Sequence, residues 1–293
     1  MSEVTLMRQD ATGVIPAWLA EVSRTGSKRT PEEYQRHLNH FLAGTDPAQA
    51  TTAHVHAFVY GPGLSGRMPS PSTTTVRLAA INSFYDFALR MGLVTTNPCI
   101  GVKRPSRRSS TPHGLDLGEL KALLKEIPDT PGGLRDKSII LTCVLTGLRR
   151  SEIMSMRAGD LSRNGAIYYT VRTKGGKERR RELPDPAFIA ITVALEAQGR
   201  PLNTLAPEDR IFDISHQTFY AYLRKYAARA SLTVRPHDLR HTAAKLRRDT
   251  GASIEEVSSF LGHASISTTA LYLARLEGES DNGWQAVAKA LGV

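Results

Sequence analysis

The segment RPHDLRHTAA, residues 235–244, contains two histidines and an arginine at helical spacing directly after a proline. Proline is tolerated in the first turn of a helix because its missing N–H would have no partner there, so Pro236 predicts a helix start. His237, Arg240 and His241 then fall at positions i, i+3 and i+4 and share one face of that helix. Such a face suits either a metal ion or an anion, and the rest of the sequence is needed to choose.

The charge of the chain favours an anionic partner. The net charge is +10, and 28 of the 38 basic residues are arginine. The planar guanidinium group binds phosphate oxygens in a bidentate manner, so this composition is typical of nucleic-acid proteins. Solubility is the alternative explanation, and charge alone does not separate the two.

The remaining composition predicts a cytoplasmic protein. The longest apolar stretch, residues 139–148, is about half of the ~20 residues that a bilayer span requires. The first ten residues, MSEVTLMRQD, do not resemble a signal peptide. The two cysteines, Cys99 and Cys143, form neither a disulfide framework nor a metal-binding pattern.

Helical patterns run from residue 14 to about residue 98. Thr30, Pro31 and Glu33 suggest a helix start with a capping box at Thr30. We expect a four-helix, strand-free domain. Its helices are expected at residues 15–23, 30–42, 51–61 and 71–92.

Residues 101–112, GVKRPSRRSSTP, contain four basic residues, two prolines and no acidic residue. This composition predicts an exposed linker, which either runs along a polyanion or is merely solvated. The expected domains are therefore an N-terminal helical domain at residues 1–100, this linker, and a second domain at residues 113–293.

The second domain is expected to be mainly α with a small antiparallel β-sheet. Two strands are predicted around a Lys-Gly-Gly-Lys turn within residues 166–184, and Ser253 and Glu256 form a capping pair at a helix start. The expected helices cover residues 115–127, 133–147, 151–156, 215–230, 253–262 and 267–276, in addition to the helix that begins at Pro236.

A zinc site is one hypothesis for the polar helix face. His237 and His241 could both bind zinc, with His263 as a third ligand. The zincin pattern requires glutamate at position 238, where this chain has Asp238, and the cation Arg240 would lie next to the dication. These residues disfavour zinc.

A phosphate suits the same residues better. Arg149 and Arg150 follow Gly147, which is expected to end a helix, while Lys174 lies in the predicted hairpin turn and Arg240 on the histidine face. Arginines from separate segments can stabilise the negative charge that grows on a phosphorane-like transition state. Phosphoryl transfer without a metal also needs a nucleophile and proton carriers. The candidates are Tyr272 as nucleophile, Lys174 as acid, and His237 or His263 as proton carriers.

Five motifs in order resemble the tyrosine recombinase (phage integrase) family. They are TGLRRSEI, a lysine in a β-hairpin turn, HDLRH, LGH, and a tyrosine nine positions after that last histidine. Residues 72–98 also resemble the last helix of the family's N-terminal core-binding domain. The resemblance extends from about residue 14 to residue 276.

The resemblance implies which residues handle the phosphate. Arg149 and Arg240 would bind the scissile phosphate, and His263 would hydrogen-bond a non-bridging oxygen. Tyr272 would attack the phosphorus and become linked to the 3′ phosphate of DNA. The bond energy would be retained in this phosphotyrosine, so neither ATP, a metal nor any other cofactor is expected.

The resemblance also implies which residues move protons. Lys174 would protonate the departing 5′ oxygen, His237 would assist proton transfer around the tyrosine, and Glu152 would orient its neighbours. Lys177 is the alternative to Lys174 and is otherwise expected to contact phosphate. His241 is expected to be a packing or capping residue.

The implied function is a site-specific DNA recombinase, a two-domain C-shaped clamp that exchanges strands through a Holliday junction. Its expected partners are double-stranded recombination sites, three further protomers in a tetramer, and accessory DNA-bending proteins, with no membrane. Phage integration, chromosome dimer resolution, transposon resolution and cassette capture all remain open. The C-terminal tail offers an apolar face at Trp284, Val287 and Leu291 for a neighbouring protomer or for its own domain.

Two alternatives share the motifs. A type IB topoisomerase uses similar tyrosine and arginine chemistry, but the recombinase-type N-terminal domain disfavours it. A DNA-binding protein that kept the fold and lost catalysis would lack an expected catalytic residue, whereas every such position is filled here.

Overall fold

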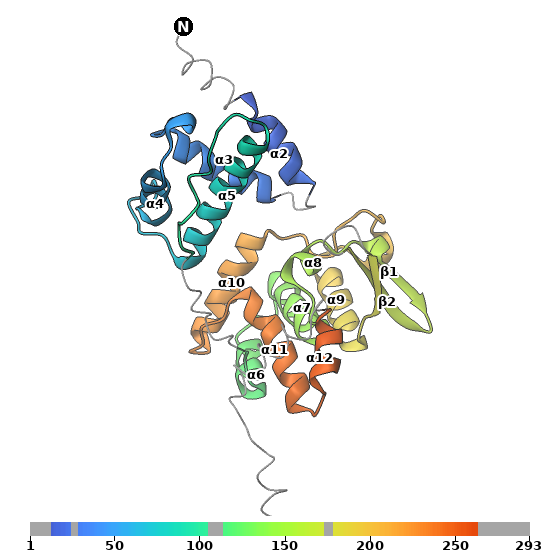
Figure 1. Ribbon diagram of the computed structural model, residues 1–293. Helices are drawn as coiled ribbons and strands as arrows, with labels where there is room; N and C mark the ends of the chain where they lie inside the picture. The colour runs from blue at the N-terminus through green and yellow to red at the C-terminus, as the bar shows by residue number, and fades with distance from the viewer. Residues whose placement is uncertain (1–12, 25–28, 105–113, 173–177, 263–293) are drawn as a thin grey trace, which may run out of the picture. The chain divides into compact units, whose positions relative to one another are not determined.

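The structure is a computed structural model that describes residues 13–24, 29–104, 114–172 and 178–262 (Figure 1). The chain divides into two compact units: of the described residues, those up to 104 belong to the first unit and those from 114 onward to the second. In the described ranges, no helix is both long enough and apolar enough to cross a bilayer.

The first unit is helical, and its described residues contain no strand. Trp18, Phe84 and Tyr85 are among the fully buried side chains of its core. Val102 and Lys103 still contact this unit, because Val102 packs on the core and the Tyr60 hydroxyl donates to the Lys103 carbonyl. The helices are α2 (Ile15–Ser23), α3 (Arg29–Leu42), the 3-10 helix η1 (Pro47–Gln49), α4 (Thr52–Tyr60) and α5 (Pro71–Arg90).

The predicted start of the second helix is wrong by a residue or more. Helix α3 begins at Arg29, so Thr30 lies inside it rather than at its N-cap. Pro31 is compatible with this longer helix because residues of the first turn need no N–H partner.

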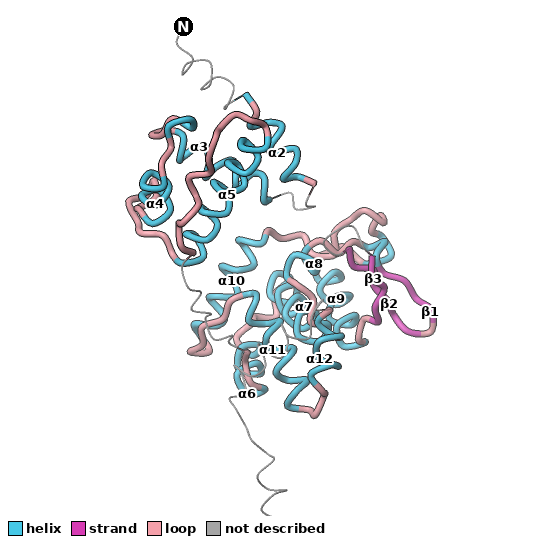
Figure 2. The backbone as a smooth tube through the Cα atoms, in the orientation of Figure 1, coloured by secondary structure: helices cyan, strands magenta, loops and turns pink. Residues whose placement is uncertain are grey.

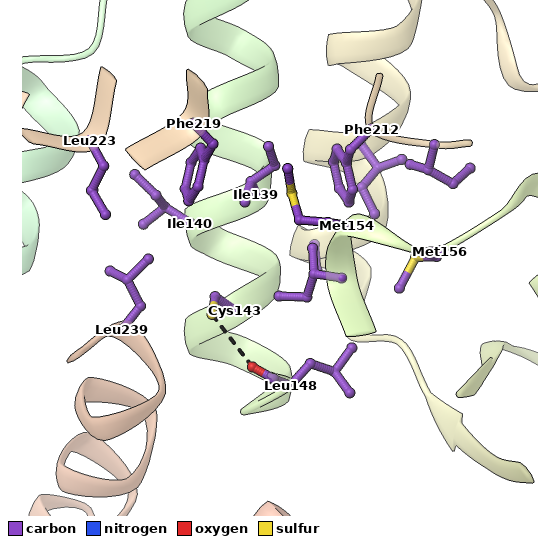
Figure 3. Close-up of a cluster of buried hydrophobic side chains, with 14 of the residues drawn as sticks. Ile139, Ile140, Cys143, Leu148, Met154, Met156, Phe212, Phe219, Leu223 and Leu239 are labelled. Carbon is purple, nitrogen blue, oxygen red and sulfur yellow. Dashed lines mark hydrogen bonds between the residues drawn. The ribbon is translucent and has the colours of Figure 1, made fainter. Parts of the chain in front are cut away.

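In the second unit, helix α7 (Pro131–Thr146) packs against α9 (Asp185–Ala197), α10 (His216–Arg229) and α11 (Pro236–Asp249). Ile139, Ile140 and Cys143 of α7 are almost completely buried among side chains of its neighbours (Figure 3). The remaining helices of this unit are α6 (Leu117–Lys125), α8 (Arg150–Met154), η2 (Ala158–Asp160), η3 (Leu202–Thr204) and α12 (Ile254–Leu261).

The sheet has three antiparallel strands in the order β1 (Leu161–Asn164), β2 (Ala166–Arg172) and β3 (Glu178–Glu182) (Figure 2). The two predicted strands are β2 and β3, and their pairing ends at Arg172 opposite Glu178. Strand β1 was not predicted. It joins β2 through a turn at Gly165, whose φ of 73° suits glycine.

The sequence pattern does not predict helix α9 either. Its sequence contains the β-branched residues Ile189, Ile191, Thr192 and Val193, which lower helix propensity. Burial of Ala187, Ile191, Ala194 and Leu195 against the core outweighs that preference.

The end of α7 is a sharp turn at Gly147. Its φ is 64°, which favours glycine, and its amide donates to the Cys143 carbonyl. The Cys143 thiol donates in turn to the Leu148 carbonyl (Figure 3). A Cβ at position 147 would lie 2.6 Å from the Phe260 ring. Glycine is therefore required here for both its backbone conformation and its lack of a side chain.

We predict that Gly147→Ala destabilises the protein more than Gly165→Ala. Both glycines have positive φ, so each alanine costs roughly 1–2 kcal/mol of backbone strain. Only the alanine at position 147 meets a neighbour, because nothing lies within 4 Å of a Cβ at position 165. The clash with Phe260 should add roughly 1–3 kcal/mol of lost unfolding free energy. Urea denaturation of both variants tests this, and equal losses would contradict it.

Candidate active site

Arg149 lies directly after the turn that ends α7 and is the N-cap of α8. Its backbone N–H donates to Glu152 Oε2 at 2.8 Å, and its Nη1 donates to Glu152 Oε1 at 3.0 Å. The Arg149 side chain is 47% exposed and that of Glu152 is 11% exposed. Glu152 therefore restrains the Arg149 guanidinium from its buried side, and the half-exposed guanidinium retains N–H groups that face solvent.

Arg240 of α11 is the most deeply buried of the predicted site residues that the structure describes, at 5% exposure. Its Nη1 donates to the Gly147 carbonyl, and its Nη2 donates to the Leu261 carbonyl at 2.6 Å. Two of its five N–H groups thus donate to carbonyls at the ends of α7 and α12, and within the described residues the other three have no acceptor.

Arg240 stays charged despite its burial. Desolvation by burial, followed by the positive charge of Arg149, lowers its pKa to about 10, while Glu152 acts in the opposite direction. This value is well above neutral pH, so the guanidinium remains protonated. Arg149 and Arg240 together place two positive charges from separate helices in one region, and this pair suits a phosphate.

His237 and His241 lie on the same face of α11, as their spacing predicts, and their ring centroids are 4.4 Å apart in a T-shaped arrangement. Desolvation on the packed side of the His237 ring lowers its pKa, and the charges of Arg240, Arg149 and Arg150 lower it further, while Asp238 opposes them. The lowered pKa favours the neutral imidazole, which is the form that can accept a proton.

Asp238 accepts a hydrogen bond from the Arg235 backbone N–H at 2.8 Å at the start of α11. It takes the place of the glutamate that a zincin would need. Among the residues that the structure describes, no three histidine, cysteine, aspartate or glutamate side chains are grouped for a metal ion. His263, the third ligand of the zinc hypothesis, lies outside the described residues.

Three of the predicted catalytic residues, Lys174, His263 and Tyr272, lie outside the described residues, as does Lys177. The structure therefore brings together Arg149, Glu152, His237 and Arg240. The C-terminal tail with Trp284, Val287 and Leu291 is also outside the described part of the chain.

A second group of side chains near Arg240 was not singled out from the sequence. Arg181 of β3 is close enough to contribute to the lowered pKa of both Arg240 and Arg247. Arg179 lies on the same face of β3, and its guanidinium group lies next to Gly262. The run of three arginines at 179–181 was the available signal, because alternate residues of a strand share a face.

The chain matches known protein families over nearly the same residues that contain the motifs. Residues 114–279 match the phage integrase family, and residues 15–92 match the phage integrase N-terminal SAM-like domain. The chain is 34% identical over 265 residues to tyrosine recombinase XerC of Pelobacter propionicus, which covers 86% of each protein. It is 28% identical over 268 residues to tyrosine recombinase XerD of Listeria monocytogenes, covering 86% of this chain and 89% of the relative.

Solved structures share the fold. A lambda integrase tetramer bound to a Holliday junction matches 92% of this chain and 79% of its own, with a TM-score of 0.70 and 17% identity. The XerH site-specific recombinase in a post-cleavage complex with a palindromic difH substrate matches 90% of this chain and 79% of its own, with a TM-score of 0.65 and 19% identity.

We predict that the imidazole of His237 titrates below the ordinary 6.5 and that Arg149→Gln raises its pKa, because one nearby positive charge is removed. This pKa shift also makes the stability of the fold depend on pH. Since the folded-state pKa is below the unfolded value, the unfolded state takes up the proton first. Stability is then lost as pH falls through 6.5 toward the folded pKa. NMR titration of the histidine rings measures both effects.

His37 is the internal control for that titration. Its pKa is lowered by burial and by Arg36 in the other unit, so it should not respond to Arg149→Gln. A His237 midpoint that is insensitive to Arg149→Gln would show that the arginine charge does not reach the imidazole.

Proposed function

The chain belongs to the phage integrase family of tyrosine recombinases and is a tyrosine-type site-specific DNA recombinase, and from this premise we propose that Arg149 and Arg240 bind the scissile phosphate and Tyr272 attacks it. The observation that carries the proposal is the buried, charged Arg240 next to Arg149. The two guanidiniums come from α11 and from the N-cap of α8, and both retain N–H donors after their intramolecular bonds.

The proposed cleavage step needs no external energy. The Tyr272 oxygen forms a bond to phosphorus while the bond from phosphorus to the 5′ oxygen of the DNA breaks. The leaving oxygen takes a proton from Lys174, and the phenolic proton passes to His237, whose lowered pKa supports its role as an acceptor. His263 donates to a non-bridging oxygen. Attack of a 5′ hydroxyl on the phosphotyrosine reverses the step and joins the strands.

Glu152 acts in this proposal by orienting Arg149. Its two oxygens accept from the Arg149 backbone and side chain, which restricts the guanidinium to one direction. A carboxylate that is 11% exposed and already paired would repel a DNA phosphate less than an exposed one.

The partners follow from the family and from the charge. The substrate is a pair of double-stranded recombination sites on which four protomers exchange strands through a Holliday junction. A net charge of +10 supports binding of the DNA backbone, and a solved relative is a tetramer on such a junction. We further propose that the two domains and the linker at residues 101–112 form a clamp around DNA. The protein is cytoplasmic in this proposal, and accessory DNA-bending proteins take part in the reaction.

We predict that Tyr272→Phe abolishes the covalent protein–DNA adduct and leaves DNA binding intact, because phenylalanine lacks the attacking oxygen. A suicide substrate with a nick near the cleavage point traps the adduct on a denaturing gel. Binding is followed by mobility shift on the same DNA. An adduct that persists in the variant would assign the nucleophile to another residue.

A site-free supercoiled plasmid serves as the companion substrate. A recombinase should leave it supercoiled, whereas relaxation would favour a type IB topoisomerase-like activity.

We predict that Arg149→Ala slows cleavage with little loss of stability, since the side chain is half exposed. The loss of transition-state stabilisation should be about 3 kcal/mol, as for other anion-binding groups. Arg240→Lys should slow cleavage and also lower the melting temperature, because lysine cannot donate to both the Gly147 and Leu261 carbonyls. The structural loss should be roughly 1–3 kcal/mol. Single-turnover cleavage rates and calorimetry separate the two effects, and wild-type cleavage by Arg149→Ala would remove this arginine from the proposed site.

A further inference from the structure

Two guanidinium groups lie over the aromatic ring of Phe260 in α12. The Arg247 guanidinium carbon is 3.6 Å from the ring centroid, and that of Arg181 is 5.4 Å from it. Arg247 comes from α11 and Arg181 from β3, so the ring is the point where three elements meet. The negative face of an aromatic ring attracts such cations. Phe260 therefore connects the end of α12 to both neighbours.

The same ring packs against the turn that carries Arg149. A Cβ at Gly147 would lie 2.6 Å from one ring carbon and 2.7 Å from the next, so the ring fills the space that glycine leaves open. Arg247 reinforces this contact, because its Nη2 donates to the Leu145 carbonyl at 3.2 Å. The end of α7 is thus held by the aromatic ring and by the arginine stacked on that ring.

An aromatic side chain at position 260 suits the positive charge of this region. Arg149, Arg181, Arg240 and Arg247 gather around the ends of α7 and α12, and packing them together requires some compensating negative potential. A further carboxylate would supply it but would also repel a phosphate at the site. An aromatic face attracts the arginines without carrying a net charge.

We propose that Phe260 is a positioning residue for the recombinase reaction: its ring, held by Arg247 and Arg181, fixes the end of α12 against the turn at Gly147. Arg149 lies two residues after Gly147, and His263 follows Gly262, the C-cap of α12, in the sequence. The ring acts through these residues and touches no reacting atom. This inference rests on the proposed function, which assigns Arg149 and His263 to the phosphate.

The test is Phe260→Leu, which keeps an apolar side chain and removes the aromatic face. At saturating DNA, the single-turnover rate of adduct formation should fall about tenfold, because cation–π contacts of this kind and small displacements of catalytic groups each carry effects of this size. The DNA dissociation constant should stay within about twofold of wild type, because no phosphate contact is removed. Phe260→Tyr, which restores an aromatic face, should recover most of the rate.

A matched control is available in the first unit. Phe58 also has an arginine over its ring, with the Arg77 guanidinium carbon 5.2 Å from the centroid. Phe58→Leu removes the same kind of contact far from Arg149 in the sequence, so the cleavage rate at saturating DNA should not change. A loss of rate in this control equal to that of Phe260→Leu would overturn the inference.

A double-mutant cycle tests the stacked pair directly. Arg247→Met keeps the apolar stem and removes the guanidinium, so it should slow adduct formation in the same way as Phe260→Leu. The double variant should lose less than the sum of the two single losses, because both changes remove the same Arg247–Phe260 contact. Fully additive losses would overturn the inference.

The outcomes also separate this inference from the proposed function. If Phe260→Leu cleaves at the wild-type rate while Tyr272→Phe forms no adduct and Arg149→Ala is slowed as predicted, only the positioning role fails. A melting temperature that falls in Phe260→Leu, with no recovery of rate in Phe260→Tyr, also rejects the positioning role and leaves the proposed function intact. If Tyr272→Phe still forms the adduct and Arg149→Ala cleaves at the wild-type rate, the proposed function itself fails.

Discussion

The site depends on one buried cation. Helices α7 and α12 both end at glycines with positive φ, and their last carbonyls have no partner within the helix. Arg240 donates to the carbonyls of Gly147 and Leu261 and so joins these two ends. A buried charge is costly unless it is paired, so the carbonyls stabilise the guanidinium as much as the guanidinium stabilises the turns. The segments that lead to Arg149 and to His263 both start from this junction.

The cations around Arg240 outnumber their intramolecular partners. Glu152 pairs with Arg149, and the Phe260 ring lies under Arg181 and Arg247, but among the described residues no carboxylate forms a salt bridge with Arg240. Burial, and after it repulsion from Arg149 and Arg181, lowers the pKa of Arg240, and an anion that binds nearby relieves this repulsion. In the proposed reaction that anion is the scissile phosphate, so part of the strain in the free protein becomes binding energy for DNA.

Local signals predicted the elements that carry the site. Pro236 begins α11, and Ser253 and Glu256 cap α12, because each of these signals acts within a single helical turn. The missed elements depend on distant partners. Helix α9 has β-branched residues and is a helix because it packs on α7, and the four-residue strand β1 exists because it pairs with β2.

The sequence by itself determined the residue types, the order of the motifs and hence the family, since these need only the spacing of side chains along the chain. It also placed His237, Arg240 and His241 on one helix face. Only the tertiary structure decided that Arg240 donates a hydrogen bond to the carbonyl of Gly147, 93 positions away, and that the guanidinium groups of Arg181 and Arg247 lie over the Phe260 ring. Such contacts join segments whose separation in sequence leaves no periodic pattern, and they form only when the core aligns the helices that carry them.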